Sequence, residues 1–166
     1  MCSSDLVIDV HISRLRAKID KGFDHPLLRH QSRTERITES SFADHIAAAR
    51  TFGFLKEVEW LRQHGLALGG SLENAIVIGD TGVLNPLRFE DEFVRHKILD
   101  VVGDLALVGY PIVGHVVAHR AGHALHTALA AEVLKDQEAW CLVDAPAAVP
   151  DGSFDPVAAP GAVRAH

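Results

Sequence analysis

Three side chains that can bind a metal ion recur at helical spacing in the middle of the sequence. His96, Asp100 and Asp104 are four residues apart, and an α-helix places side chains at this spacing on nearly one face. An imidazole nitrogen and a carboxylate oxygen one turn apart can bind the same Zn²⁺. The spacing also occurs in solvated pairs on helix surfaces. Apolar neighbours along the same helix favour the metal site, and Gly103, beside Asp104, indicates close approach of another segment.

Two further residues are candidates for acid–base and oxyanion chemistry. His123 begins another helical pattern, where the helix dipole lowers the pKa of an imidazole unless a carboxylate compensates. Asp104 can supply that carboxylate and keep His123 protonated as a general acid. The Thr51 hydroxyl can donate to an oxyanion. Without such chemistry, His123 is an ordinary helix-terminal residue and Thr51 an ordinary strand residue.

The elements that must position these residues alternate between helical and extended patterns. Apolar residues at helical spacing predict helices, and short β-branched runs predict strands. Helices are expected from Leu55 to Gly65, over 89–108 and over 122–137, and strands over 75–78, 112–118 and 140–143. This alternation predicts an α+β fold with helices layered on one face of a small sheet.

The composition excludes several classes of protein. The chain has 166 residues, of which 48% are hydrophobic and 23% charged, which excludes wholesale disorder. Its net charge of −6 argues against a nucleic-acid-coating protein. The sequence has no apolar run long enough for a membrane span and no signal-peptide pattern at its start. Cys2 and Cys141 are expected to be free thiols in a reducing, cytoplasmic environment.

A series of ordered motifs makes residues 42–143 resemble a known enzyme family. The motifs are ARTFGF at 49–54, GLALGGS at 65–71, FVRHKILD at 93–100, GD at 103–104 and GHAL at 122–125. Together they resemble the C-terminal domain of UDP-3-O-acyl-N-acetylglucosamine deacetylase, the zinc amidase of lipid A biosynthesis. The resemblance implies an α+β domain that carries a βαβ insert and forms the second half of a two-domain enzyme.

The resemblance also implies roles for individual residues. His96 and Asp100 match two of the family's three zinc ligands, so Zn²⁺ is the implied cofactor. His123 matches the general acid, Asp104 its paired carboxylate, and Thr51 the hydroxyl that helps to hold the oxyanion. The implied substrate is a UDP-linked, acylated glucosamine. Positions matching substrate contacts are Lys97, and, along the acyl-chain passage of the insert, Phe52, Val58, Gly70, Ser71 and Val77.

The same resemblance leaves part of the enzyme unaccounted for. The family's third zinc ligand and its general-base glutamate lie in an N-terminal domain that this sequence does not match. No glutamate in the sequence is followed directly by histidine, so a replacement for that pair is absent. We therefore expect a fragment that needs the N-terminal domain as a partner and is inactive alone.

The two ends of the chain have a different character. Residues 1–36 hold seven Lys and Arg against five Asp and Glu, which suggests a basic segment of separate origin. Residues 7–24 resemble the recognition helix of winged-helix response regulators, with a helix over 7–20, so a DNA-binding fragment is the alternative function. Residues 145–166, rich in Ala and Pro, are expected to be disordered. A non-catalytic α+β interaction domain is a third possibility.

Overall fold

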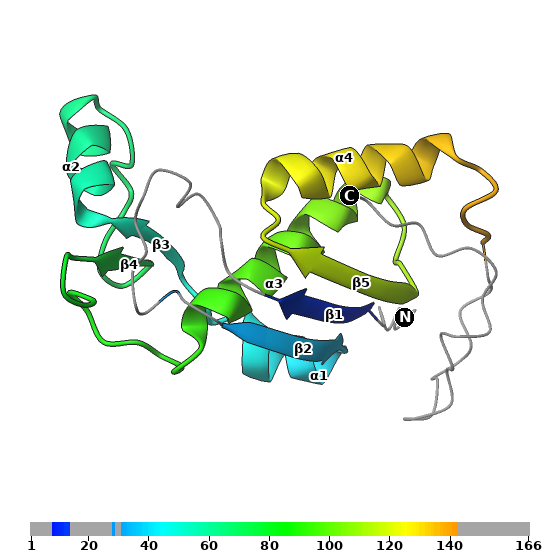
Figure 1. Cartoon of the computed structure of the whole chain (residues 1–166), viewed down its shortest axis with the longest axis horizontal. Coiled ribbons are helices and arrows are strands. Elements are labelled where there is room, and N and C mark those ends of the chain that lie inside the picture. The colour runs from blue at the N-terminus through cyan, green and yellow to red at the C-terminus, as the bar shows by residue number, and fades with distance from the viewer. Residues whose placement is uncertain (1–7, 14–27, 29–30, 143–166) are drawn as a thin grey trace.

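The computed structural model describes residues 8–13, 28 and 31–142 of the chain. Its larger sheet has three strands, in the order β2 (Ser32–Ile37), β1 (Ile8–Ser13) and β5 (Gly114–His119). The central strand β1 runs antiparallel to β2 and parallel to β5, so that Ile8 lies opposite Ile37 on one side and Gly114 on the other (Figure 1).

The helix expected over 7–20 is wrong for Ile8–Ser13, which form β1. Apolar and polar residues alternate strictly along this stretch, which is the two-residue period of a strand and not the period of a helix. The winged-helix resemblance therefore fails where it should supply the element that enters the DNA groove. Residues 7 and 14–20 lie outside the described residues.

The segment assigned a separate origin shares its sheet with the rest of the domain. Strands β1 and β2 lie before residue 42, and β5 comes after helix α3 (Glu92–Leu105). An ion pair reinforces the connection, because Arg33 Nη1 on β2 lies 2.8 Å from Asp91 Oδ2 immediately before α3. The sheet that supports the helices is therefore built largely from strands that precede the expected domain boundary.

The expected βαβ insert is confirmed. Strand β3 (Thr51–Phe54) leads directly into α2 (Leu55–Gln63), and the chain returns in β4 (Ala75–Ile78), parallel to β3. Gly65, with φ +71°, follows the helix where a left-handed residue commonly ends one. In Figure 1 this unit extends from one end of the larger sheet.

Two helices pack together beside the larger sheet and contribute side chains to the hydrophobic core. They are α3 (Glu92–Leu105), followed by a 3₁₀ turn at Ala106–Val108, and α4 (His123–Lys135) (Figure 1). The buried face of α3 is apolar at helical spacing, which anchors the helix and fixes which of its side chains face outward. The core comprises Leu28, Ile37, Ile46, Ile76, Ile78, Phe93, Val94, Ile98, Val101, Leu105, Ala118 and Ala130.

The segments outside the two helices and the insert agree only in part with the sequence predictions. Short helical segments that the sequence did not predict, α1 (Glu39–Ser41) and a π-helical turn (Phe42–Ile46), connect β2 to the insert. The strand expected over 140–143 is wrong for residues 140–142, which adopt no regular structure. Cys141 is exposed and unpaired, while Cys2, residue 143 and the tail 145–166 lie outside the described residues. No helix in the described part of the chain has the length and apolarity to cross a membrane.

Candidate active site

Helix α3 brings the two expected metal ligands together. His96 and Asp100 lie one turn apart, and His96 Nε2 is 3.3 Å from Asp100 Oδ1. Both side chains are largely buried, with 15% and 8% of their surfaces exposed. The apolar face of α3 is fixed against the core, so this neighbouring face has little freedom to move.

The second ring nitrogen of His96 is directed toward the backbone. Its Nδ1 lies 3.2 Å from the carbonyl oxygen of Ala49, so the ring donates from Nδ1 and keeps a lone pair on Nε2. Burial lowers the pKa of His96, and the Asp100 carboxylate only partly offsets this. A neutral imidazole oriented by a backbone carbonyl is the form in which histidine binds a metal.

Distances at this pair fit a tetrahedral metal. Zinc bonds of roughly 2.0–2.2 Å to nitrogen and oxygen separate two ligand atoms by about 3.3 Å at tetrahedral angles. The His96 Nε2–Asp100 Oδ1 distance is 3.3 Å, which matches this separation. The residues present therefore fit the implied cofactor.

Helix α4 adds His123 to the same group of side chains. His123 Nδ1 lies 2.8 Å from Asp104 Oδ2, and its Nε2 lies 3.9 Å from Asp100 Oδ1. The side chain of His123 is 63% exposed, so its Nε2 can reach a bound molecule. The structure thus brings together His96, Asp100, Asp104 and His123, which the sequence had placed on two separate helices.

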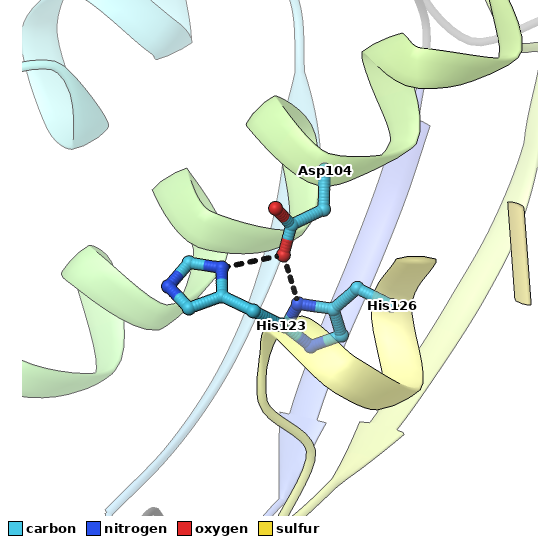
Figure 2. Close-up of side chains that lie close together, drawn as sticks. All are labelled: Asp104, His123 and His126. Carbon is cyan, nitrogen blue, oxygen red and sulfur yellow. Dashed lines mark hydrogen bonds and ion pairs between the residues drawn. The ribbon is translucent and has the colours of Figure 1, made fainter. Parts of the chain in front are cut away.

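His126 is a member of this group that sequence reasoning missed. It lies one turn after His123 on α4, and its Nδ1 is 2.8 Å from Asp104 Oδ2, the oxygen that His123 also contacts (Figure 2). Burial raises the pKa of Asp104, but N–H donation from His126 and His123 lowers it further, so the net shift is downward. The His-x-x-His spacing on one helix face was the signal that could have revealed His126.

Asp104, His123 and His126 also form a group whose potential ligand atoms lie within 4.8 Å of one another. The two contacts of 2.8 Å are hydrogen-bond distances and are shorter than the separation of about 3.3 Å between two ligands of one tetrahedral zinc. The geometry therefore fits a hydrogen-bonded array better than a second metal site.

Lys97 and Phe52 lie beside His96 and Asp100. Lys97 Nζ is 2.5 Å from Asp100 Oδ2 and 5.6 Å from the centre of the Phe52 ring. The centroids of the Phe52 and His96 rings are 6.1 Å apart, so β3 lies next to the two expected metal ligands. Thr51, the preceding residue, is exposed at the start of β3.

The other expected substrate-binding residues lie in the βαβ insert. Val77 on β4 pairs with Gly53 on β3. Val58 of α2 packs over Gly53, because a Cβ added to that glycine would lie 3.6 Å from Val58 Cγ2. Gly70 and Ser71 lie in the loop between α2 and β4. A small pocket in this insert is lined by none of these residues; its lining is Phe54, Leu55, Lys56, Glu57, Ile78 and Asp80.

A buried ion pair that the sequence did not predict holds β3 on α3. Glu92 is fully buried in the first turn of α3, and its carboxylate accepts from Arg50 Nε at 2.8 Å and from Arg50 Nη2 at 2.9 Å. It also accepts from the backbone N–H groups of Arg50 and Arg88. Because Arg50 follows Ala49, this pair fixes the carbonyl that orients His96.

One expectation about α3 is wrong. A Cβ on Gly103 would meet no atom within 4 Å among the described residues, so close approach does not explain this glycine.

The fold and the site together define a class: an α+β domain with a βαβ insert that presents a histidine and a carboxylate one helical turn apart and, beside them, a histidine–carboxylate pair between adjacent helices. Comparison with known proteins identifies the family. Residues 4–135 match the UDP-3-O-acyl N-acetylglycosamine deacetylase family, and the chain belongs to that family. The match includes much of the segment expected to have a separate origin.

Curated relatives agree with this assignment. The chain is 54% identical over 131 residues to UDP-3-O-acyl-N-acetylglucosamine deacetylase of Citrifermentans bemidjiense, covering 78% of this chain and 43% of that protein. It is 51% identical over 141 residues to the protein of that name from Syntrophotalea carbinolica, covering 84% and 46% respectively. The chain therefore spans less than half the length of the curated relatives it matches.

Proposed function

We propose that this chain supplies the zinc-binding and proton-donating part of a deacetylase acting on UDP-3-O-acyl-N-acetylglucosamine in lipid A biosynthesis. The reaction hydrolyses the N-acetyl amide, so that water and the amide give acetate and a free amine. The observation that supports it best is the separation of 3.3 Å between His96 Nε2 and Asp100 Oδ1, with His123 Nε2 close to the same carboxylate. The same proposal places the reaction in the cytoplasm.

In this proposal His96 and Asp100 hold Zn²⁺. Zinc in such a site lowers the pKa of bound water toward about 7 and polarises a carbonyl. His123 donates a proton from Nε2 to the leaving amine, and Asp104 accepts from its Nδ1 and so keeps Nε2 directed outward. The Thr51 hydroxyl donates to the oxyanion that develops on the amide carbonyl.

Substrate binding in this proposal uses residues close to His96 and Asp100. Lys97 offers a cation beside Asp100, and Phe52 offers an aromatic face next to it. The acyl chain follows the βαβ insert past Val58, Gly70, Ser71 and Val77. Each methylene buried there contributes about 0.8 kcal/mol to binding.

We further propose that residues 1–166 deacetylate poorly without the family's N-terminal domain. His96 and Asp100 are two protein ligands, whereas catalytic zinc sites use three. The resemblance places the third ligand and the general-base glutamate in that other domain. A positioned base typically contributes about 10²–10⁴-fold to the rate.

Calorimetric titration of residues 1–166 with Zn²⁺ tests the ligand assignment. His96→Ala and Asp100→Ala should weaken binding by about 10–100-fold or more, because each removes a ligand atom. His64→Ala is the matched control, since His64 is exposed on the insert and bonds the Trp60 carbonyl. Equal zinc affinity in all four proteins would refute the assignment.

A second assay tests the activity. Acetate release from UDP-3-O-acyl-N-acetylglucosamine is measured with residues 1–166 alone and after adding the N-terminal half of the Citrifermentans bemidjiense relative. Activity that requires both parts supports the proposal. Full turnover by residues 1–166 alone would show that another group here replaces the missing ligand and base.

A further inference from the structure

His126 is a buried histidine for which the proposed reaction has no use. Only 5% of its surface is exposed, whereas the side chain of His123, one turn earlier, is 63% exposed. Residues three apart on a helix face the same way, and both imidazoles reach the end of α3 from α4. A polar ring in this position needs a physical reason, because burying it without hydrogen bonds is unfavourable.

The hydrogen bonds of Asp104 determine which nitrogen of His126 carries the proton. Both imidazoles place Nδ1 at 2.8 Å from a single oxygen, Asp104 Oδ2 (Figure 2). An ionised carboxylate oxygen can only accept, so both Nδ1 atoms must donate. Nδ1 of both His123 and His126 therefore carries a proton.

The other nitrogen of His126 indicates its charge. His126 Nε2 is buried and has no hydrogen-bond partner among the described residues. A proton on Nε2 would be an N–H donor without an acceptor in a buried position, in addition to a buried positive charge. His126 is therefore neutral, with Nδ1 as its one donor.

We propose that His126 is a positioning residue, a neutral Nδ1–H donor that fixes the Asp104 carboxylate and through it the ring of His123. This inference rests on the proton-donor role proposed for His123. An exposed imidazole held by one bond to a mobile carboxylate would sample several orientations. A carboxylate oxygen fixed by a buried ring holds His123 with Nδ1 inward and Nε2 toward Asp100, 3.9 Å from its Oδ1.

The ¹⁵N NMR spectrum of the histidine side chains tests this in residues 1–166 without any activity assay. At pH 7.5 the wild-type chain should show a proton on Nδ1 of both His123 and His126, with His126 uncharged. This first measurement needs no variant. A His126 that carries its proton on Nε2, or on both nitrogens, would overturn the proposal.

Two variants then test the effect on His123. His126→Leu fills the space but removes the donor, and should convert the neutral form of His123 from the Nδ1–H tautomer to a mixture dominated by the form free histidine prefers. His126→Asn keeps an N–H donor near the position of Nδ1 and should restore the wild-type tautomer. A His123 tautomer that is unchanged in His126→Leu, with the variant shown by circular dichroism to be folded, would also overturn the proposal.

Added Zn²⁺ separates positioning from metal binding. The signals of His96 should shift on titration with Zn²⁺, while the tautomer of His126 stays the same. A coordination shift at His126 would show that Asp104, His123 and His126 bind metal and would refute the positioning role. Failure of the acetate assay would count against the proposed function and would leave these NMR results unaffected.

Discussion

Replacing Glu92 with leucine should destabilise the domain severely. Glu92 is fully buried, and Arg50, its partner, is 7% exposed. The substitution leaves the guanidinium buried with only two backbone acceptors, the carbonyls of Leu72 and Pro86. Removing one partner of a buried ion pair typically costs about 3–5 kcal/mol, so we expect a loss of about 4 kcal/mol. That is a large part of the roughly 5–15 kcal/mol available to a whole domain.

Urea unfolding followed by circular dichroism measures this loss. Glu92→Gln keeps one acceptor oxygen and the side-chain shape, so it should lose less, about 1–3 kcal/mol. The matched control is Glu132→Leu on α4, where an exposed carboxylate pairs with Lys135 three residues later. That change should cost at most about 0.5 kcal/mol. A Glu92→Leu loss no larger than the control would refute the role assigned to this pair.

Acid dependence provides a second check on the same pair. Burial raises the pKa of Glu92, but the hydrogen bonds from Arg50 and Arg88 lower it further, to below its usual value of 4.5. A carboxyl group whose pKa is depressed on folding stabilises the fold above the unfolded-state pKa, and this contribution is lost as pH falls through the lower folded-state pKa. The stability difference between wild type and Glu92→Gln should therefore be constant near neutral pH and shrink below about pH 4.5. A difference that grows in acid would contradict the sign of the shift.

Four further substitutions have expected outcomes. Phe93→Ala removes a core ring packed edge-on against Phe52, with ring centroids 5.0 Å apart, and should lower the free energy of unfolding in urea by about 3–5 kcal/mol. A loss under about 1 kcal/mol would mean that neighbouring side chains fill the cavity, against this expectation. Gly103→Ala should raise the free energy of unfolding by about 0.5–1 kcal/mol, measured as a higher melting temperature, because the new Cβ is unobstructed within α3. Gly109→Ala should lower the free energy of unfolding by roughly 1–2 kcal/mol, since φ is +84° there, and melting-temperature shifts of the same sign in both variants would contradict this contrast. Asp104→Asn should reduce acetate release in the two-part assay by about 10²–10⁴-fold, and an undiminished rate would remove Asp104 from the proposed mechanism.

Features set within one helix were predictable from the sequence. The geometry of an α-helix alone brings His96 next to Asp100, and α3, α4 and β4 occur where the patterns predicted them. Features that join distant segments were not predictable. Arg50 and Glu92 are 42 residues apart, and only the packing of β3 on α3 makes them partners.

The error at β1 has a different origin. The alternation in Ile8–Ser13 indicates a strand, whereas the likeness of the same residues to a recognition helix predicts a helix. Its partner strands begin at Ser32 and Gly114, both too distant from Ser13 for a short hairpin turn, so the sequence holds no hairpin signal that pairs β1 with another strand. For His126 the spacing to His123 was visible, but only the position of Asp104 shows that both rings donate to one oxygen.

The position of β1 in the middle of its sheet has a consequence for synthesis of the protein. Its parallel neighbour β5 follows about a hundred residues later, so at about 5–20 residues per second the ribosome delivers β5 roughly 5–20 s after β1. Strand β2 is synthesised before β5 and can pair with one edge of β1 during this interval. The other edge stays open until β5 emerges, and an open strand edge readily pairs with a neighbouring nascent chain. Slowed translation between β2 and β5 should therefore increase aggregation of the newly made protein.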